Sequence, residues 1–279
     1  MKRWQFIALL VGSPTLLFAQ LSDQNLGVSD AAADGSAVPV VGQQSTNVAS
    51  PRSDPRNSAA ADSPDDPRFT VSVTSLAAPE KAQRAFQKGE EEVQKGKWQS
   101  AANNFKRAVA MYPRYAIAWL ELGRVHAREN SWAEARQCFQ QAVAQDSKLT
   151  DGYLELAHVA AEQQNWNDLA DESNRLLQLS PDSSPEYWFL NSAAYYNLGD
   201  LDRAQASIIR GLHLDARHDF AQMEYLYGLI LGSKKDYKAA AQHVSEYLRL
   251  APNADDSQAA RNLLAGYEYR EKLAEEDQQ

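Results

Sequence analysis

The strongest constraint on the fold of this chain is a set of large side chains that recurs about every 34 residues. Trp98, Trp132 and Trp166 are 34 residues apart, and Leu201 and Tyr237 continue the series after steps of 35 and 36. Three residues after these stand Ala101, Ala135, Leu169, Ala204 and Ala240. Seven residues after the same five large side chains stand Phe105, Phe139, Ser173, Ile208 and Val244. A period of roughly 20–50 residues is typical of arrays of stacked structural units, so the sequence predicts a repeat protein.

Each unit has the pattern of a helical hairpin. Its first half contains a small residue, which in successive units is Gly89, Gly123, Ala157, Ser192 and Gly228. The units end at Pro113, Ser147, Pro181, Ala216 and Pro252. Small residues let two helix axes approach to about 8–10 Å, and a proline stops the second helix. We expect each hairpin to bury its apolar surface against its neighbours, because it cannot do so alone.

Residues 116–149 resemble one tetratricopeptide repeat. The family places W, L, G, Y, A, F and A where this unit has Trp119, Leu122, Gly123, His126, Ala135, Phe139 and Ala142. Residues 82–252 resemble five such repeats in succession, although Leu169, Ser173, Asn191 and Gly211 depart from the pattern in the third and fourth units. The resemblance implies an all-α fold: a right-handed α-solenoid of about five helix-turn-helix units over residues 80–279, with a C-terminal capping helix from about residue 255.

The first 19 residues have the order of an export signal. Lys2 and Arg3 precede an apolar stretch that begins at Phe6, is broken at Pro14 and ends at Ala19. This stretch is shorter than the roughly 20 apolar residues that a membrane-spanning helix needs. We expect a signal peptide cleaved after Ala19, no stable membrane insertion thereafter, and an exported protein, periplasmic or secreted; retention as an anchor is the alternative.

Residues 20–79 differ in composition from the rest of the chain. They are rich in Ala, Ser, Asp, Gly and Pro, and Phe69 is their one aromatic residue. Such a segment buries too little apolar surface to offset the entropy lost on ordering. We expect a disordered linker that acts as a spacer, with an acidic tail that binds its own partner as the alternative.

Charge and motifs argue against several classes of function. The formal net charge of −9 is unfavourable for binding nucleic acid. Cys138 is the one cysteine, so an internal disulfide and a cysteine-based zinc site are excluded, although an exported thiol could cross-link a dimer. The sequence has no phosphate-binding, dinucleotide-binding, zinc-protease or serine-hydrolase motif. We expect no catalytic residue, no cofactor and no metal, and therefore a protein that is not an enzyme.

The resemblance implies that the first helix of each unit lines a concave groove. The fifth position of each unit is apolar throughout and consists of Phe86, Leu120, Leu154, Phe189 and Tyr225. The polar candidates for the same groove are Glu90, Arg124, Arg128, His158, Tyr196 and Asn197. Either the apolar stripe binds a peptide or helix, or it packs adjacent first helices together. A clamp for a terminal carboxylate, which the family builds from a lysine and an asparagine, is not expected because Phe86 and Glu90 stand in those places.

The repeat architecture favours a non-enzymatic scaffold that binds a protein or peptide segment in the concave groove. The alternative is an accessory subunit of a cell-envelope assembly or glycan-processing complex, with catalysis in a partner. A third hypothesis, an enzyme in its own right, has no motif in its support. The sequence leaves the partner and the oligomeric state open.

Overall fold

The computed structural model describes residues 77–276, which are built from α-helices joined by short connections. The predicted signal peptide and residues 20–76 of the predicted linker lie outside the described residues. The helices are α4 (Glu80–Gln94), α5 (Trp98–Met111), α6 (Ala116–Arg128), α7 (Trp132–Gln145), α8 (Thr150–Glu162), α9 (Trp166–Leu179), α10 (Pro185–Asn197), α11 (Leu201–Leu214), α12 (Gln222–Ser233), α13 (Tyr237–Leu250) and α14 (Ser257–Glu276). Residues 77–276 therefore form an α-solenoid of five helical hairpins, α4–α5 to α12–α13, followed by α14, as the sequence predicts.

The turn inside each hairpin has the same backbone geometry in all five units. One residue of each turn has a positive φ, between 53° and 79°, and these residues are Gly96, Asn130, Gln164, Gly199 and Lys235. A left-handed residue of this kind ends an α-helix and redirects the chain. In the last three hairpins the second helix begins with a side-chain cap from Asn165, Asp200 or Asp236. The shared turn explains why the repeat period is nearly constant.

Small residues on the first helix of a hairpin face large residues on the second. A β-carbon added at Gly89 would lie 2.5 Å from the ring of Phe105, and one at Gly123 would lie 2.5 Å from the ring of Phe139. Both rings are fully buried. The small and the large residues that recur in the sequence are therefore the residues that contact each other between the two helices of a hairpin.

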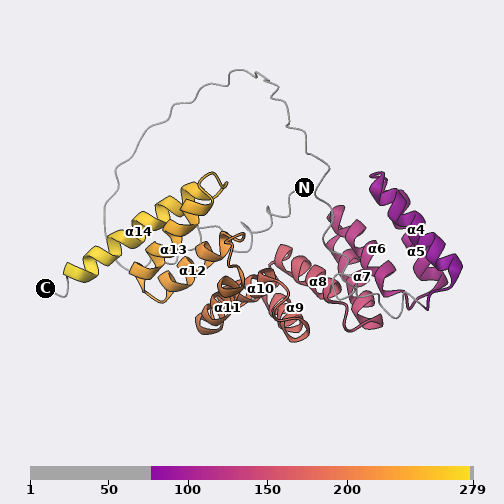
Figure 1. The fold of residues 1–279 in the computed structure, drawn as a ribbon, viewed down its shortest axis with the longest axis horizontal. Helices are drawn as coiled ribbons and strands as arrows, with labels where there is room; N and C mark the ends of the chain where they lie inside the picture. Colours follow the sequence, from indigo (N-terminus) through magenta and orange to yellow (C-terminus); the bar gives the residue numbers. More distant parts are fainter. Residues whose placement is uncertain (1–76, 277–279) are drawn as a thin grey trace, which may run out of the picture.

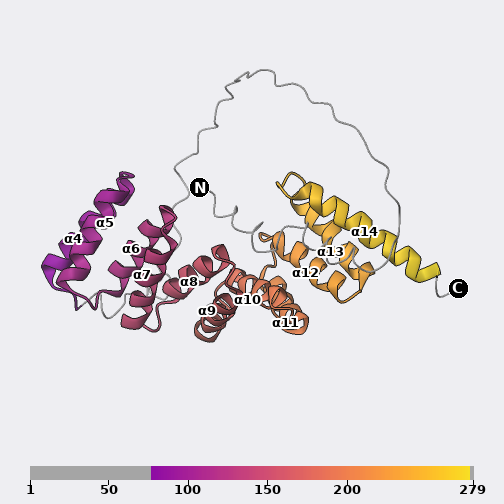
Figure 2. The ribbon, with the colours of Figure 1, turned by 180° about the vertical axis from the view of Figure 1, so that it is seen from behind.

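The hairpins follow one another along an open arc, with α4 and α5 at one end and α14 at the other (Figures 1 and 2). The first helices α6 and α8 contact each other, as do α10 and α12. The second helices α9 and α11 lie along the outer edge of the arc in both views. We call the side formed by α4, α6, α8, α10 and α12 the concave face, and the side formed by the second helices the convex face.

The apolar core runs between the helices along the whole array. Its largest fully buried side chains include Phe105, Leu169, Leu190, Met223 and Tyr247. The last helix, α14, packs on α13 and buries Ala260 and Tyr267, so it closes the end of the array as the predicted capping helix would. Within residues 77–276, no helix is both long and apolar enough to span a membrane.

Candidate functional site

The apolar side chains expected along the concave face are buried. Their exposed fractions are 9% for Phe86, 3% for Leu120, 8% for Leu154, 3% for Phe189 and 7% for Tyr225. Each belongs to an apolar cluster; the ring of Phe86, for example, packs against those of Phe105 and Tyr115 at centroid distances of 5.5 and 5.2 Å. This burial supports the packing alternative for the stripe, because side chains so enclosed present little surface to a partner.

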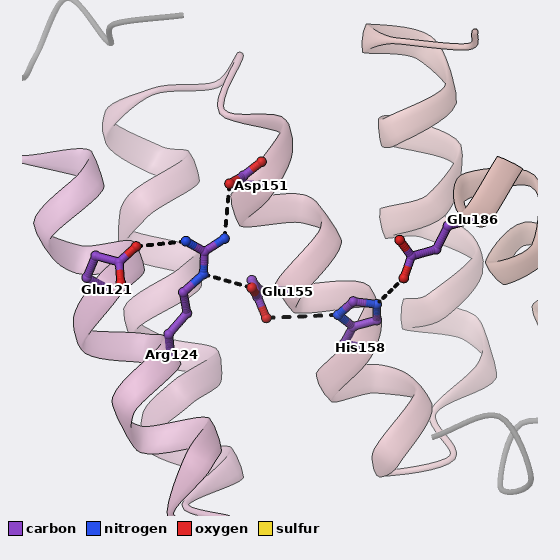
Figure 3. Close-up of polar contacts among 6 residues, drawn as sticks. All are labelled: Glu121, Arg124, Asp151, Glu155, His158 and Glu186. Atoms are coloured by element: carbon purple, nitrogen blue, oxygen red, sulfur yellow. Dashed lines mark hydrogen bonds and ion pairs between the residues drawn. The ribbon is translucent and has the colours of Figure 1, made fainter. Parts of the chain in front are cut away.

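The exposed part of the concave face is polar, and Arg124 on α6 is its centre (Figure 3). Its guanidinium donates from Nη1 to Glu121 Oε1 at 2.7 Å, from Nε to Glu155 Oε1 at 2.8 Å and from Nη2 to Asp151 Oδ2 at 3.0 Å. Glu121 lies on the same helix, whereas Asp151 and Glu155 lie on α8. Arg124 therefore joins two successive first helices through charge-assisted hydrogen bonds.

His158 extends this network from α8 to α10. Its Nε2 lies 3.1 Å from Glu186 Oε1, and its Nδ1 lies 3.9 Å from Glu155 Oε2 (Figure 3). A histidine between two carboxylates is held in its charged form. We call Glu121, Arg124, Asp151, Glu155, His158 and Glu186 the concave ion-pair network.

The network shifts the pKa values of its members. Burial alone would lower the pKa of His158, but hydrogen bonds to Glu155 and Glu186 and the charges of both raise it to about 9. Burial alone would raise the pKa of Glu155, but hydrogen bonds and charges from His158 and Arg124 lower it to about 2. Burial would also lower the pKa of Arg124, yet Glu121 and Glu155 raise it. At neutral pH these three groups are therefore charged.

The other candidates lie on either side of the network. Glu90 on α4 is exposed, yet partial desolvation of its carboxyl by its neighbours, together with the charge of Glu121, raises its pKa. The guanidinium of Arg128 lies 4.0 Å from the centroid of the Trp98 ring. On α10, Tyr196 is half-buried, and Asn197 donates from Nδ2 to the carbonyl oxygen of Ala193 at 2.8 Å. Among the proposed residues, the structure thus brings Arg124 and His158 into one network, through Glu155, and leaves Glu90, Arg128, Tyr196 and Asn197 outside it.

Sequence reasoning missed the four acidic members of the network. Glu121 and Glu155 occupy equivalent positions in successive units, three residues before Arg124 and His158, and this spacing on a helix was the signal available. Asp151 and Glu186 occupy equivalent positions, the second of the third and fourth units. Their pairing depends on how far one hairpin is rotated against the next.

The described residues offer little for catalysis. Among them, no group of three His, Cys, Asp or Glu side chains could hold a metal ion. Cys138 is buried, and burial raises the pKa of its thiol to about 11, so the thiol is not poised to react or to cross-link a dimer.

Comparisons with known proteins agree on the repeat. A family model described as "Tetratricopeptide repeat" matches residues 86–149 and 192–255. A search of curated proteins finds no match.

Solved structures share the fold at low sequence identity. MamA 41-end from Desulfovibrio magneticus RS-1 is 15% identical with a TM-score of 0.57, and the match covers 64% of this chain and 99% of that one. YrrB, a protein described as having an unusual peptide-binding site, is 18% identical with a TM-score of 0.59 over 68% and 98% of the two chains. A tetratricopeptide repeat protein from Parabacteroides merdae is 16% identical with a TM-score of 0.60 over 71% and 78%. The sequence match identifies residues 86–149 and 192–255 as tetratricopeptide repeats, and the solved structures share the fold of the described residues.

Proposed function

We propose that this chain is a non-enzymatic interaction module that binds a segment of a partner protein on its concave face. Tetratricopeptide repeat proteins generally mediate protein–protein interactions, and YrrB, which shares the fold, is described as having a peptide-binding site. The fold is thus of a type that serves as a scaffold rather than as a catalyst.

The concave ion-pair network is the observation that carries the proposal. Its side chains come from α6, α8 and α10 and hold one another in place, yet Arg124 keeps 35% and Asp151 52% of the side chain exposed. Polar groups fixed before binding lose little conformational freedom when a partner docks. We therefore expect the partner to contact charged and amide groups along α4 to α10, with the apolar stripe serving as support beneath them.

A photo-crosslinking experiment tests this location. A photoreactive benzophenone amino acid is placed at Glu90 on α4 or Glu162 on α8, and in matched controls at Gln140 or Ala110, which are exposed on the second helices α7 and α5. Irradiation in an extract of the source cells should yield one crosslinked protein from positions 90 and 162 and none from 140 and 110. The opposite pattern would move the partner to the convex face.

The same crosslinked product separates the two hypotheses of function. If the captured protein is an enzyme of cell-envelope assembly or glycan processing, adding the purified chain should change the turnover rate of that enzyme. Such a change would support the accessory-subunit alternative. If the captured protein has no activity that responds to the chain, the scaffold hypothesis stands.

Export is a second part of the proposal, and it is supported by the composition of residues 1–19. Intact-mass measurement of the protein purified from its natural source tests it. A mature chain that begins at Gln20 is expected, whereas a chain that retains residues 1–19 in a membrane fraction would favour the anchor.

A further inference from the structure

A cavity of about 430 Å³ lies on the convex face between α9 and α11. The base of this cavity is α10, which contributes Trp188, Asn191 and Tyr195. These residues follow each other at steps of three and four, so they share one face of the helix. The cavity is open to solvent rather than enclosed, and its volume falls within the roughly 300–1,000 Å³ that small-ligand sites occupy.

The floor of the cavity departs from the repeat pattern in a coordinated way. Asn191 stands where the two preceding units have Leu122 and Leu156, and Ser173 stands where the first two units have Phe105 and Phe139. Asn191 is 2% exposed and Ser173 is fully buried. A buried amide in an apolar column costs free energy unless it is hydrogen-bonded, so apolar residues would suffice here if packing were the whole purpose.

Hydrogen bonds connect these polar groups across three helices. Asn191 donates from Nδ2 to Ser173 Oγ at 3.0 Å and to Asn174 Oδ1 at 2.9 Å, and its Oδ1 accepts from Ser207 Oγ at 2.6 Å. Asn174 donates from Nδ2 to the hydroxyl of Tyr195 at 2.9 Å. The floor is therefore rigid and uncharged.

Two hydrogen-bonding groups on the floor retain capacity for a ligand. The side-chain amide nitrogen of an asparagine carries two N–H groups. Within residues 77–276, Asn174 Nδ2 donates only to the hydroxyl of Tyr195. The Ser207 hydroxyl donates to Asn191 and keeps lone pairs that can accept. A ligand hydroxyl can accept from the first group and donate to the second.

The walls of the cavity select against a charged ligand. Leu177 and Ala206 face it from α9 and α11 and provide apolar surface. Arg203 is the cationic residue of the lining, but its Nε donates to Asp200 Oδ2 at 2.5 Å and its guanidinium lies 4.3 Å from the centroid of the Tyr195 ring. The net charge beside the cavity is thus close to zero, and an anion would find no unpaired positive charge in the lining.

We infer that this cavity binds the side chain of a tyrosine in a partner segment. The aromatic ring would pack between Leu177, Trp188 and Ala206, and the hydroxyl would bond to Asn174 and Ser207. This site lies on the convex face, so it does not depend on the concave-face proposal.

The test uses N-acetyl-tyrosinamide as the probe and N-acetyl-phenylalaninamide as its matched control. Binding is followed by NMR, through the side-chain amide signals of Asn174 and Asn191 in the purified protein. We expect the tyrosine probe to bind at least tenfold more tightly than the phenylalanine probe, because a site built to bond a hydroxyl rejects the analogue that lacks it. Equal affinities would overturn the assignment of the hydroxyl.

Three variants keep the result interpretable. Ala206→Phe fills the cavity from an exposed position on α11 and should abolish binding, while Ala110→Phe at an exposed position on α5 should leave it unchanged. Asn191→Leu restores the residue of the preceding units and should weaken binding at least tenfold. Binding that survives Ala206→Phe, with the circular dichroism spectrum unchanged, would place the probe elsewhere and overturn the proposal.

Two further probes address other ligand chemistries. N-acetyl-O-phosphotyrosinamide should bind more weakly than the tyrosine probe, and tighter binding would show that the cavity takes an anion instead. Methyl β-glucoside should give no shift of the Asn174 and Asn191 signals. A shift with the glucoside but none with the tyrosine probe would make this a sugar site and overturn the tyrosine proposal.

Discussion

The side-chain amide of Asn191 on α10 donates a hydrogen bond to the hydroxyl of Ser173 on α9 across 3.0 Å. Each residue replaces a large apolar side chain of the repeat, and each lies in the core. Both residues have further partners: Ser173 Oγ donates to the carbonyl oxygen of Leu169 at 2.7 Å, and Asn191 also bonds to Asn174 and Ser207. The departures from the repeat in the third and fourth units therefore meet in one hydrogen-bonded network, which changes the chemistry of the core without changing the fold.

Replacing Gly123 by alanine should destabilise the protein, because the added β-carbon would lie 2.5 Å from the ring of Phe139 and 3.1 Å from the β-carbon of Cys138. We expect the free energy of unfolding to fall by about 1–3 kcal/mol in urea denaturation. Gly266→Ala on α14 is the matched control, since nothing lies within 4 Å of its added β-carbon. That control should be neutral or stabilise by up to about 1 kcal/mol through helix propensity. Equal effects at the two positions would contradict the packing of α6 on α7.

The pair Gly123 and Phe139 also explains why the fold was predictable from sequence. Close contact between the helices of one hairpin requires a small residue at a fixed distance from a large one, and that distance recurs as a visible column. Contacts between successive hairpins do not produce such a recurring column in the sequence. Arg124 meets Glu155 and Asp151 because of the rotation from one unit to the next, which the sequence does not state.

The concave stripe was ambiguous for the same physical reason. Leu120 and Leu154 are apolar whether they pack or bind, and the sequence pattern is identical in both cases. In the structure Leu120 is buried in a cluster with residues of α7 and α8, and Leu154 in a cluster with residues of α9 and α10, which favours packing.

Truncating Leu120 or Leu154 to alanine should lower the free energy of unfolding by about 2–5 kcal/mol for each substitution. The reason is the loss of buried apolar contacts, since the two side chains are 3% and 8% exposed. Met111→Ala, at a side chain that is 42% exposed on α5, is the control and should change stability by less than about 0.5 kcal/mol. If Leu120→Ala and Leu154→Ala left thermal unfolding unchanged but weakened partner binding, the stripe would be a binding surface.

Replacing His158 by glutamine should remove a pH-dependent part of the stability. The pKa of His158 is raised to about 9 by Glu155 and Glu186, against the desolvation that would lower it. A raised pKa means that the folded state binds the proton more tightly. The stabilisation is therefore complete below about pH 6.5, the ordinary histidine value, and is lost as pH rises through about 9. We expect His158→Gln to cost on the order of 2 kcal/mol at pH 6 and progressively less as pH rises from about 6.5 to 9, measured by denaturation across this range.

His213→Gln is the control for that experiment, because His213 is exposed near the end of α11. Its effect should stay under about 0.5 kcal/mol at every pH. A constant difference between wild type and His158→Gln from pH 6 to pH 10 would mean that the ion pairs with Glu155 and Glu186 contribute nothing through the histidine's charge.

Glu172 on α9 should destabilise the protein at alkaline pH. Burial, followed by the negative charges of Asp168 and Asp171, raises the pKa of its carboxyl to about 7. The folded state therefore favours the protonated acid, so this contribution is complete below about pH 4.5 and is lost as pH rises through 7. Glu172→Gln keeps the shape of the protonated side chain and carries no charge. We expect it to raise the free energy of unfolding by on the order of 1 kcal/mol at pH 8, allowing for screening by solvent at this partly exposed site. The free energy of unfolding should change little at pH 5.

Asp182→Asn, at an exposed position in the turn after α9, should show no comparable gain. Equal stability of Glu172→Gln and wild type at pH 8 would mean that solvent and Arg136, whose charge opposes the shift, already neutralise the cost of this carboxylate.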